Sequence, residues 1–129
     1  MPMNCAAMPK EEIRPVAGAQ GPIIDLVHLS RQTLGDGALE NELLRLFIMQ
    51  AKQYAAWLEE PFAPGDALKR ADLTHRLKGS ARAIGAFPLA ATAEVYEEAL
   101  RAGAEDVSSA AKRLAAALED ARLAATQLV

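Results

Sequence analysis

The segment 73–86, LTHRLKGSARAIGA, predicts a helix around which the rest of the chain can be arranged. Its apolar residues recur three to four positions apart, at Leu73, Leu77, Ala81 and Ile84. That spacing is typical of one buried face of a helix. At about 100° per residue, His75 falls roughly opposite the last three of these residues. We therefore expect the helix to bury one face and to present an imidazole on the other.

Gly79 lies one turn after His75, where a glycine costs a helix about 1 kcal/mol relative to alanine. Two interpretations are open. A lone glycine in a helix usually marks close packing of a neighbouring helix, but it can also keep space clear beside the ring. Lys78 lies within reach of an anion held on the imidazole, and Arg82 adds positive charge one turn further on. Space, a nucleophilic nitrogen and an ammonium group together favour a site that holds a phosphoryl group.

Residues 75–81, HRLKGSA, followed by IGA at 84–86, resemble the signature of histidine-containing phosphotransfer (HPt) domains. That signature is His-x-Leu-Lys-Gly-Ser/Ala-Ser/Ala, with Gly-Ala some residues later. The segment 46–51, LFIMQA, is similar to the preceding helix of that family. The resemblance covers roughly residues 22–128. It implies a four-helix bundle in which His75 accepts a phosphoryl group and passes it to an aspartate of a partner.

The resemblance also implies a set of site residues around His75. Lys78 and Gly79 match the motif and are expected to neutralise and accommodate the phosphoryl group. Gln50 matches a glutamine that is directed toward the active histidine and can hydrogen-bond the ring or the phosphoryl oxygens. From its residue type alone, Gln50 could equally be a polar residue at the edge of the core.

A surface around His75 is expected to dock the partner. Arg76 and Arg82 would set electrostatic complementarity, and Asp72 is assigned to the same surface. Leu68 and Ile48 would form its apolar rim, although either could equally belong to the core.

The chain carries no Gly-x-x-x-x-Gly-Lys loop and no carboxylate cluster suited to Mg²⁺. We therefore expect neither a cofactor nor a metal of its own. The resemblance implies that the Mg²⁺ belongs to partner receiver domains, with the donor aspartate on a hybrid sensor histidine kinase and the acceptor aspartate on a response regulator. The expected function is that of a phosphoryl carrier in a multistep phosphorelay, without enzyme activity alone.

Two alternatives remain. One is a degenerate HPt-like bundle that acts only as an adaptor, which retention of His75, Lys78 and Gly79 disfavours. The other is a histidine kinase dimerisation module or phosphatase. Those families usually place an acidic residue directly after the active histidine, where this chain has Arg76.

The composition agrees with a single small helical domain. Of 129 residues, 51% are hydrophobic but only 5% are aromatic, which favours helices packed through small side chains. The net charge of −3, with no basic face interleaved with aromatics, gives no reason to expect nucleic acid. No apolar run reaches the ~18 residues of a membrane span, and the opening lacks a secretion signal. With the single cysteine, Cys5, these features predict a cytoplasmic protein. The resemblance to HPt domains implies a monomer.

Turn and capping residues divide the chain. Residues 1–21 are expected to form a flexible tail, in which Cys5 is an exposed thiol without a reactive role. The alternative is that a short amphipathic segment with Ile13 and Val16 docks on the bundle. Residues 22–129 should form an all-α, up-down four-helix bundle with a short additional N-terminal helix. The expected helices span 26–34, 38–60, 67–84, 87–102 and 107–127.

Several side chains carry specific expectations within these helices. Asp25, Asp36 and Asp66 should cap the first three helices, and Gly85 should end the third. The second helix should bury a stripe that includes Leu39, Leu43, Leu46, Phe47, Gln50, Tyr54, Trp57 and Leu58. Arg70 departs from the family pattern, which suggests a helix start that is frayed or tilted outward. Glu94, Glu97 and Glu98 should be solvated, and His28 should be structural.

Overall fold

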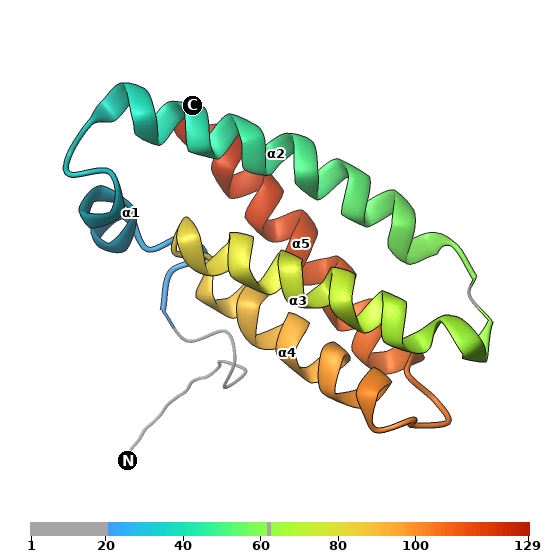
Figure 1. Ribbon diagram of the computed structural model, residues 1–129. Helices are drawn as coiled ribbons and strands as arrows, with labels where there is room; N and C mark the ends of the chain where they lie inside the picture. Colours follow the sequence, from blue (N-terminus) through green and yellow to red (C-terminus); the bar gives the residue numbers. More distant parts are fainter. Residues whose placement is uncertain (1–20, 62) are drawn as a thin grey trace, which may run out of the picture.

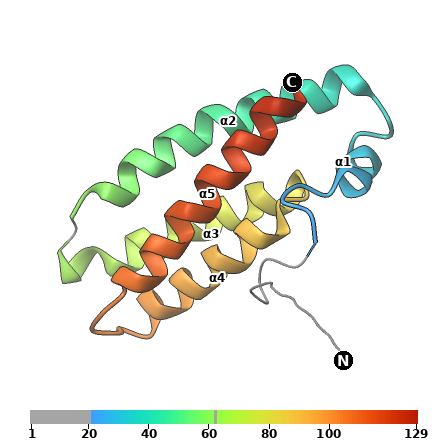
Figure 2. The same cartoon turned by 180° about the vertical axis from the view of Figure 1, so that it is seen from behind.

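The computed structural model describes residues 21–61 and 63–129, and every regular element in those ranges is helical. The helices are α1 (Leu26–Gln32), α2 (Gly37–Glu59), α3 (Ala67–Ala83), α4 (Phe87–Arg101) and α5 (Ser108–Leu128), with a 3₁₀ turn, η2 (Pro64–Asp66), before α3. Figures 1 and 2 show α2 to α5 as a bundle, with α1 lying at the end where α2 begins. The predicted all-α bundle with an extra N-terminal helix is confirmed. The predicted tail, with Cys5, Ile13 and Val16, lies outside the described residues, except for Gly21.

Aspartates begin the first two helices as predicted. The Asp25 carboxylate accepts the backbone N–H groups of Val27 and His28, and the Asp36 carboxylate accepts those of Ala38 and Leu39. Asp66 also precedes its helix, but its side chain makes no capping hydrogen bond. Asp66 (φ −98°, ψ 5°) is itself the last residue of the 3₁₀ turn η2, whereas the backbones of Asp25 and Asp36 are extended. Since a capping side chain reaches the first turn from the extended conformation, the capping prediction for Asp66 was wrong.

Gly85 ends α3 in the left-handed conformation, with φ +82°, as the sequence predicted. Its carbonyl accepts the backbone N–H of Asp25 at 2.8 Å, and the N–H of Ala86 bonds back to the carbonyl of Ala81 at 2.8 Å. A Cβ at Gly85 would lie only 2.7 Å from the Asp25 carbonyl oxygen. The glycine therefore both turns the chain into α4 and allows the segment before α1 to dock on that turn.

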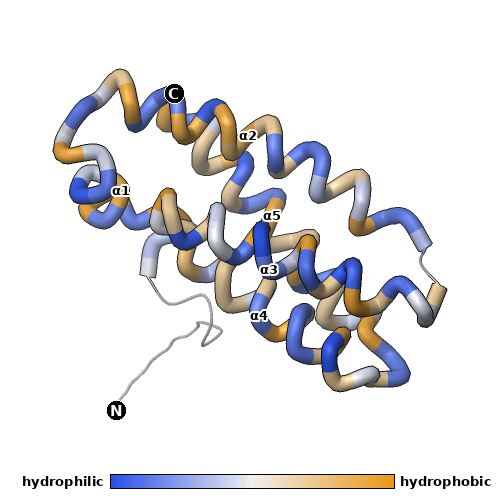
Figure 3. The backbone as a smooth tube through the Cα atoms, viewed as in Figure 1, coloured by the Kyte–Doolittle hydropathy of each residue, from blue (hydrophilic) through white to orange (hydrophobic). Residues whose placement is uncertain are grey.

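The core runs along the bundle axis, where α3 packs most closely on α4 and α2 packs on α5. Alanines that are completely buried line these contacts, which lets the helix backbones approach closely; they are Ala51, Ala71, Ala81, Ala93, Ala121 and Ala125. Larger buried side chains fill the space between them, chiefly Leu29, Leu77, Leu89, Tyr96, Leu114 and Leu118. Figure 3 shows apolar residues alternating with polar ones along each helix, as expected of helices with one buried face.

The buried face of α2 is rotated from the one predicted. Leu44, Phe47 and Ala51 are buried, whereas Leu39 and Leu46 are 41% and 49% exposed. The reason is that α2 packs mainly on α5 and makes little contact with α3. Periodicity predicted a helix here, but the choice of face depends on which neighbour it meets.

Arg70 corrects the expectation of a frayed start to α3. It is only 5% exposed, and its guanidinium donates to the carbonyls of Trp57 and Glu60 at 3.4 and 3.1 Å. The guanidinium carbon also lies 4.4 Å from the centre of the Trp57 ring. Arg70 thus bonds two carbonyls at the end of α2, of which that of Trp57 also accepts the backbone N–H of Glu60, and ties α2 to α3.

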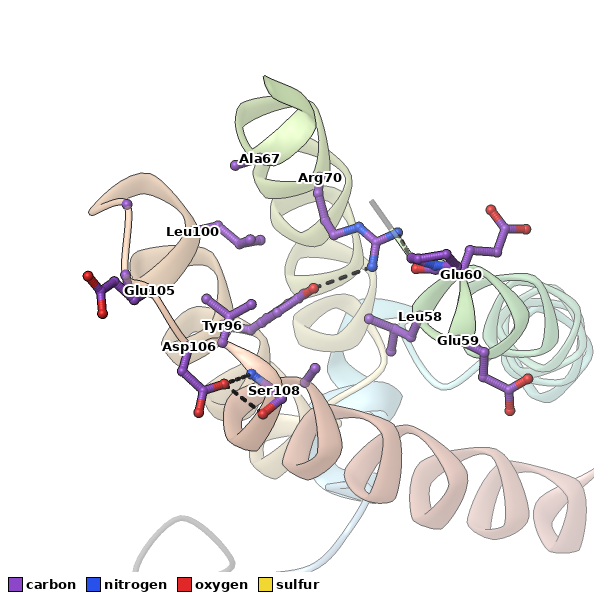
Figure 4. A pocket seen from close by; sticks show the side chains of 15 residues that line it. Leu58, Glu59, Glu60, Ala67, Arg70, Tyr96, Leu100, Glu105, Asp106 and Ser108 are labelled. Carbon is purple, nitrogen blue, oxygen red and sulfur yellow. Dashed lines mark hydrogen bonds between the residues drawn. The ribbon is translucent and has the colours of Figure 1, made fainter. Parts of the chain in front are cut away.

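A cavity of about 710 Å³ lies at this end of the bundle. Figure 4 shows Arg70 and Tyr96 reaching into it, with a long hydrogen bond of 3.5 Å between them. Leu58, Leu100 and Ala67 provide apolar walls.

Within residues 21–61 and 63–129, no helix is long and apolar enough to cross a membrane.

Candidate functional site

His75 occupies the exposed side of α3, as the helical period predicts. Its side chain is 62% exposed, whereas Leu77 and Ala81 on the opposite side are completely buried. The packed side anchors the helix, so the imidazole stands on a rigid support while remaining open to a partner.

The buried Glu97 of α4 contacts the ring of His75. The Nδ1 atom lies 3.1 Å from Oε2 and 3.3 Å from Oε1 of this carboxylate, whose side chain is only 9% exposed. The expectation that Glu97 is solvated was wrong, because α4 packs closely on α3 and places the side chain against it. One sequence signal pointed there: Glu97 follows the buried Ala93 by one helical turn.

Lys78 and Arg101 complete the surroundings of Glu97. The Lys78 ammonium, with a side chain only 11% exposed, lies 3.0 Å from Oε1, and Arg101 Nε lies 3.0 Å from Oε2. Lys78 also lies 3.8 Å from Glu94, which Arg82 contacts at 3.2 Å. The predicted neighbours of the histidine, Lys78 and Arg82, therefore belong to one network of charges that crosses between α3 and α4.

This network determines the protonation of the site. Burial acts to raise the pKa of Glu97, but hydrogen bonds from Lys78 and Arg101 and the nearby positive charges outweigh it, so the pKa is lowered. Glu97 is therefore a carboxylate at neutral pH and can only accept hydrogen bonds. Because the Glu97 carboxylate accepts from Nδ1, a neutral His75 ring carries its proton on Nδ1. Nε2 then carries the lone pair, and among the described residues no hydrogen bond engages it.

Gly79 faces open space. Apart from its chain neighbours and the adjacent backbone of its own helix, a Cβ built on it would meet no atom of the described residues within 4 Å, and the residue is exposed. The interpretation that this glycine serves close helix packing was therefore wrong. The surface one turn beyond His75 is clear, as the alternative interpretation requires.

Gln50 lies on an exposed part of α2. It lines a cavity of about 300 Å³ with Tyr54, Trp57 and Leu73. Burial raises the pKa of Tyr54, and the charge of Arg76 acts against this rise. No hydrogen bond between Gln50 and His75 is present in the described part of the chain, so the role of Gln50 beside the ring stays a prediction.

The residues expected to dock a partner occupy different environments. Leu68 is 62% exposed, whereas Ile48 is half-buried against the core. Arg76 and Arg82 are exposed, and Asp72 is exposed but forms an ion pair with Arg101 at 3.0 Å. The surface thus contains exposed apolar and charged side chains, and its docking role stays a prediction.

The second histidine, His28, lies apart from this network. Its ring packs edge-on against Phe87, with ring centres 5.0 Å apart. That contact fits the structural role expected of it. Across the described ranges, no three His, Cys, Asp or Glu side chains gather in a way that could hold a metal ion.

Comparison with protein-family models matches residues 42–127 to the Hpt domain. Comparisons with curated proteins and with solved structures gave no significant match. The matched segment contains His75, Lys78, Gly79 and Glu97, and therefore both sides of the charge network. Because the match covers more than half of the 129 residues, the chain belongs to the Hpt domain family, whose members serve histidine phosphotransfer in phosphorelays.

Proposed function

We propose that this protein is a phosphoryl carrier, in which His75 accepts a phosphoryl group from a receiver aspartate linked to a hybrid kinase and passes it to a response-regulator aspartate. One observation supports this most directly. The exposed His75 ring is held at Nδ1 by a buried carboxylate, 3.1 Å away, while nothing in the described chain engages Nε2. A neutral imidazole with its lone pair on an exposed nitrogen is a competent nucleophile near pH 7.

The transfer step follows from this arrangement. Nε2 attacks the phosphorus of the aspartyl phosphate, the N–P bond forms, and the P–O bond to the aspartate breaks. The aspartate leaves as a carboxylate, and the ring keeps its Nδ1 proton as a phosphorylated imidazolium. Glu97, which accepts that proton in a hydrogen bond, compensates the new positive charge. The reverse step returns the phosphoryl group to an aspartate.

Two further residues support the same step. Lys78, at the edge of the site, can offer its ammonium to the phosphoryl oxygens. Gly79 leaves room for these oxygens, since a side chain would project into the open surface there. Gln50 is proposed to contact the phosphoryl group or the partner from α2.

The chemistry supports receiver domains as the partners. The chain is not an enzyme alone, because phosphoryl transfer needs positioned positive charge and an acceptor, and receiver domains supply the aspartate with its Mg²⁺. We propose docking through Arg76, Arg82, Leu68 and Ile48, and action as a monomer in the cytoplasm.

The test is incubation with an active hybrid kinase or with a phosphorylated receiver domain. A carrier acquires a label that is stable to alkali and labile to acid. His75→Gln should abolish this label while far-UV circular dichroism stays unchanged, because the exposed ring contributes little to packing. His28→Gln, the matched control, should retain it. Absence of label from every kinase and receiver of the source cell would instead favour an adaptor.

A further inference from the structure

We propose that the Asp72–Arg101 ion pair is a positioning device for phosphotransfer, which keeps Glu97 compensated and in place when Lys78 turns to the phosphoryl group. The inference rests on the proposed carrier function. It assigns to Asp72 a role within the site instead of one in docking.

The geometry forms a chain of three contacts that runs from α3 to α4 and back to α3. Asp72 precedes His75 by three residues on α3, and Arg101 follows Glu97 by four residues on α4. Arg101 Nη2 lies 3.0 Å from Asp72 Oδ1, and its Nε lies 3.0 Å from Glu97 Oε2. The same Oε2 atom contacts His75 Nδ1 at 3.1 Å. Arg101 therefore holds the very oxygen that orients the ring.

The balance of charge around Glu97 explains why its contact with Arg101 is needed. The network holds three carboxylates, those of Asp72, Glu94 and Glu97, and three cations, those of Lys78, Arg82 and Arg101. Also near the site are Arg76 of α3 and, from α2, Tyr54, whose pKa Arg76 influences. A phosphoryl group adds nearly two negative charges and competes for the nearest ammonium.

When Lys78 moves toward the phosphoryl oxygens, Glu97 loses the cation on Oε1. A carboxylate with a side chain only 9% exposed then needs a remaining positive partner, or it moves out toward water. Arg101, which Asp72 fixes from the other side, remains on Oε2. Because the guanidinium is planar and binds two carboxylates at once, it can hold Glu97 in register with the ring.

The experiment measures the rate of phosphoryl transfer from a phosphorylated receiver domain at increasing receiver concentration, for the full chain and for Asp72→Asn and Arg101→Gln. Both substitutions should lower the maximal rate by about 2- to 10-fold, the lower part of the range found for coupled neighbours. The receiver concentration at half-maximal rate should not change. The double variant should be no slower than Arg101→Gln, because Asp72 acts through Arg101.

A spectroscopic readout separates positioning from mere folding. The ¹⁵N shifts of the His75 ring should report a single Nδ1–H tautomer in the parent and a mixture in Arg101→Gln. The matched control is Arg122→Gln, which removes an arginine paired with Glu119 on α5 and should leave rate and shifts unchanged.

Three outcomes would overturn the inference. One is parental maximal rates in both single variants. Another is a higher half-maximal receiver concentration at an unchanged maximal rate, which makes Asp72 a docking residue. The third is additive losses in the double variant. These outcomes differ from failure of the carrier function, in which the parent itself takes no label.

Discussion

The Nδ1 atom of His75 lies 3.1 Å from Oε2 of Glu97, which joins an exposed ring on α3 to a buried carboxylate on α4. The contact turns the Nδ1 edge of the imidazole toward the protein, while most of the His75 side chain stays exposed to solvent. Its consequence is chemical as well as geometric, because a carboxylate at Nδ1 keeps the lone pair on Nε2 and stabilises the positive ring that phosphorylation creates.

The first prediction concerns the charge of Glu97. Glu97→Gln retains an oxygen that can accept the Nδ1–H but removes the negative charge that stabilises the phosphorylated ring. Since hydrogen bonds to charged groups contribute about 1.5–3 kcal/mol, we expect phosphoryl uptake to slow by about tenfold or more. Single-turnover labelling from a phosphorylated receiver measures it. Glu98→Gln, an exposed neighbour on the same helix, is the control. Equal rates in parent and Glu97→Gln would remove the carboxylate from the mechanism.

The lowered pKa of Glu97 predicts how stability depends on pH. Its folded-state pKa lies below the unfolded value of about 4.3, so the stabilisation is fully present above that value. It is lost as the pH falls through the folded-state pKa. Urea unfolding from pH 7 to pH 3 should therefore show a larger loss of stability in the parent than in Glu97→Gln.

The difference between these two proteins isolates Glu97. Asp106 and Glu119 also have lowered pKa values, from hydrogen bonds with Ser108 and Arg122, and affect both proteins alike. A parent-to-variant difference that stays constant with pH would contradict the assignment.

Gly79 yields a prediction in which stability and transfer move in opposite directions. Because a Cβ meets open space there, Gly79→Ala should stabilise the helix by about 1 kcal/mol. A longer side chain, as in Gly79→Gln, should slow phosphoryl transfer because it enters the space of the phosphoryl oxygens. Urea unfolding and labelling rates measure the two effects. Ala116→Gly on the exposed side of α5 should destabilise without slowing transfer. Transfer at the parental rate in Gly79→Gln would leave the glycine without a role.

The sequence predicted those features of the site that depend on a single helix. With 3.6 residues per turn, His75 and the buried Leu77 fall on opposite sides of the helix. The motif that begins at His75 also contains Lys78 and Gly79. Capping by Asp25 and the end of α3 at Gly85 are also local, since the Asp25 carboxylate bonds the next turn of backbone and the turn at Gly85 bonds Ala86 back to Ala81. These predictions needed no knowledge of which helices meet.

Features that depend on packing partners could not be read in this way. Glu97 looks like any glutamate on an amphipathic helix until α3 is laid against α4. Arg70 reads as a surface residue, yet it is buried because the end of α2 offers it carbonyls and an aromatic ring. In both cases the long-range contact compensates a charge, and the composition of one helix does not reveal it.

Arg70 itself carries a stability prediction. Arg70→Ala removes hydrogen bonds to the end of α2 and the contact with Trp57, so we expect a loss of about 2–4 kcal/mol in unfolding free energy. Chemical denaturation measures it. Arg113→Ala, an exposed arginine on α5, should change stability by no more than about 0.5 kcal/mol. If the two substitutions cost the same, the burial of Arg70 contributes nothing.

The last prediction separates two costs at the turn between α3 and α4. Gly85 and Gly103 both have positive φ, +82° and +70°, so alanine is strained at either position by about 1–2 kcal/mol. At Gly85 the new Cβ would also lie 2.7 Å from the Asp25 carbonyl, whereas at Gly103 it meets nothing within 4 Å. Gly85→Ala should therefore be the more destabilising by urea unfolding, with faster amide exchange in α1. Labelling of His75 should persist at temperatures where the variant stays folded, because the displaced segment before α1 lies outside the α3–α4 charge network. Equal losses at the two glycines would mean that the docking of Asp25 on this turn adds no stability.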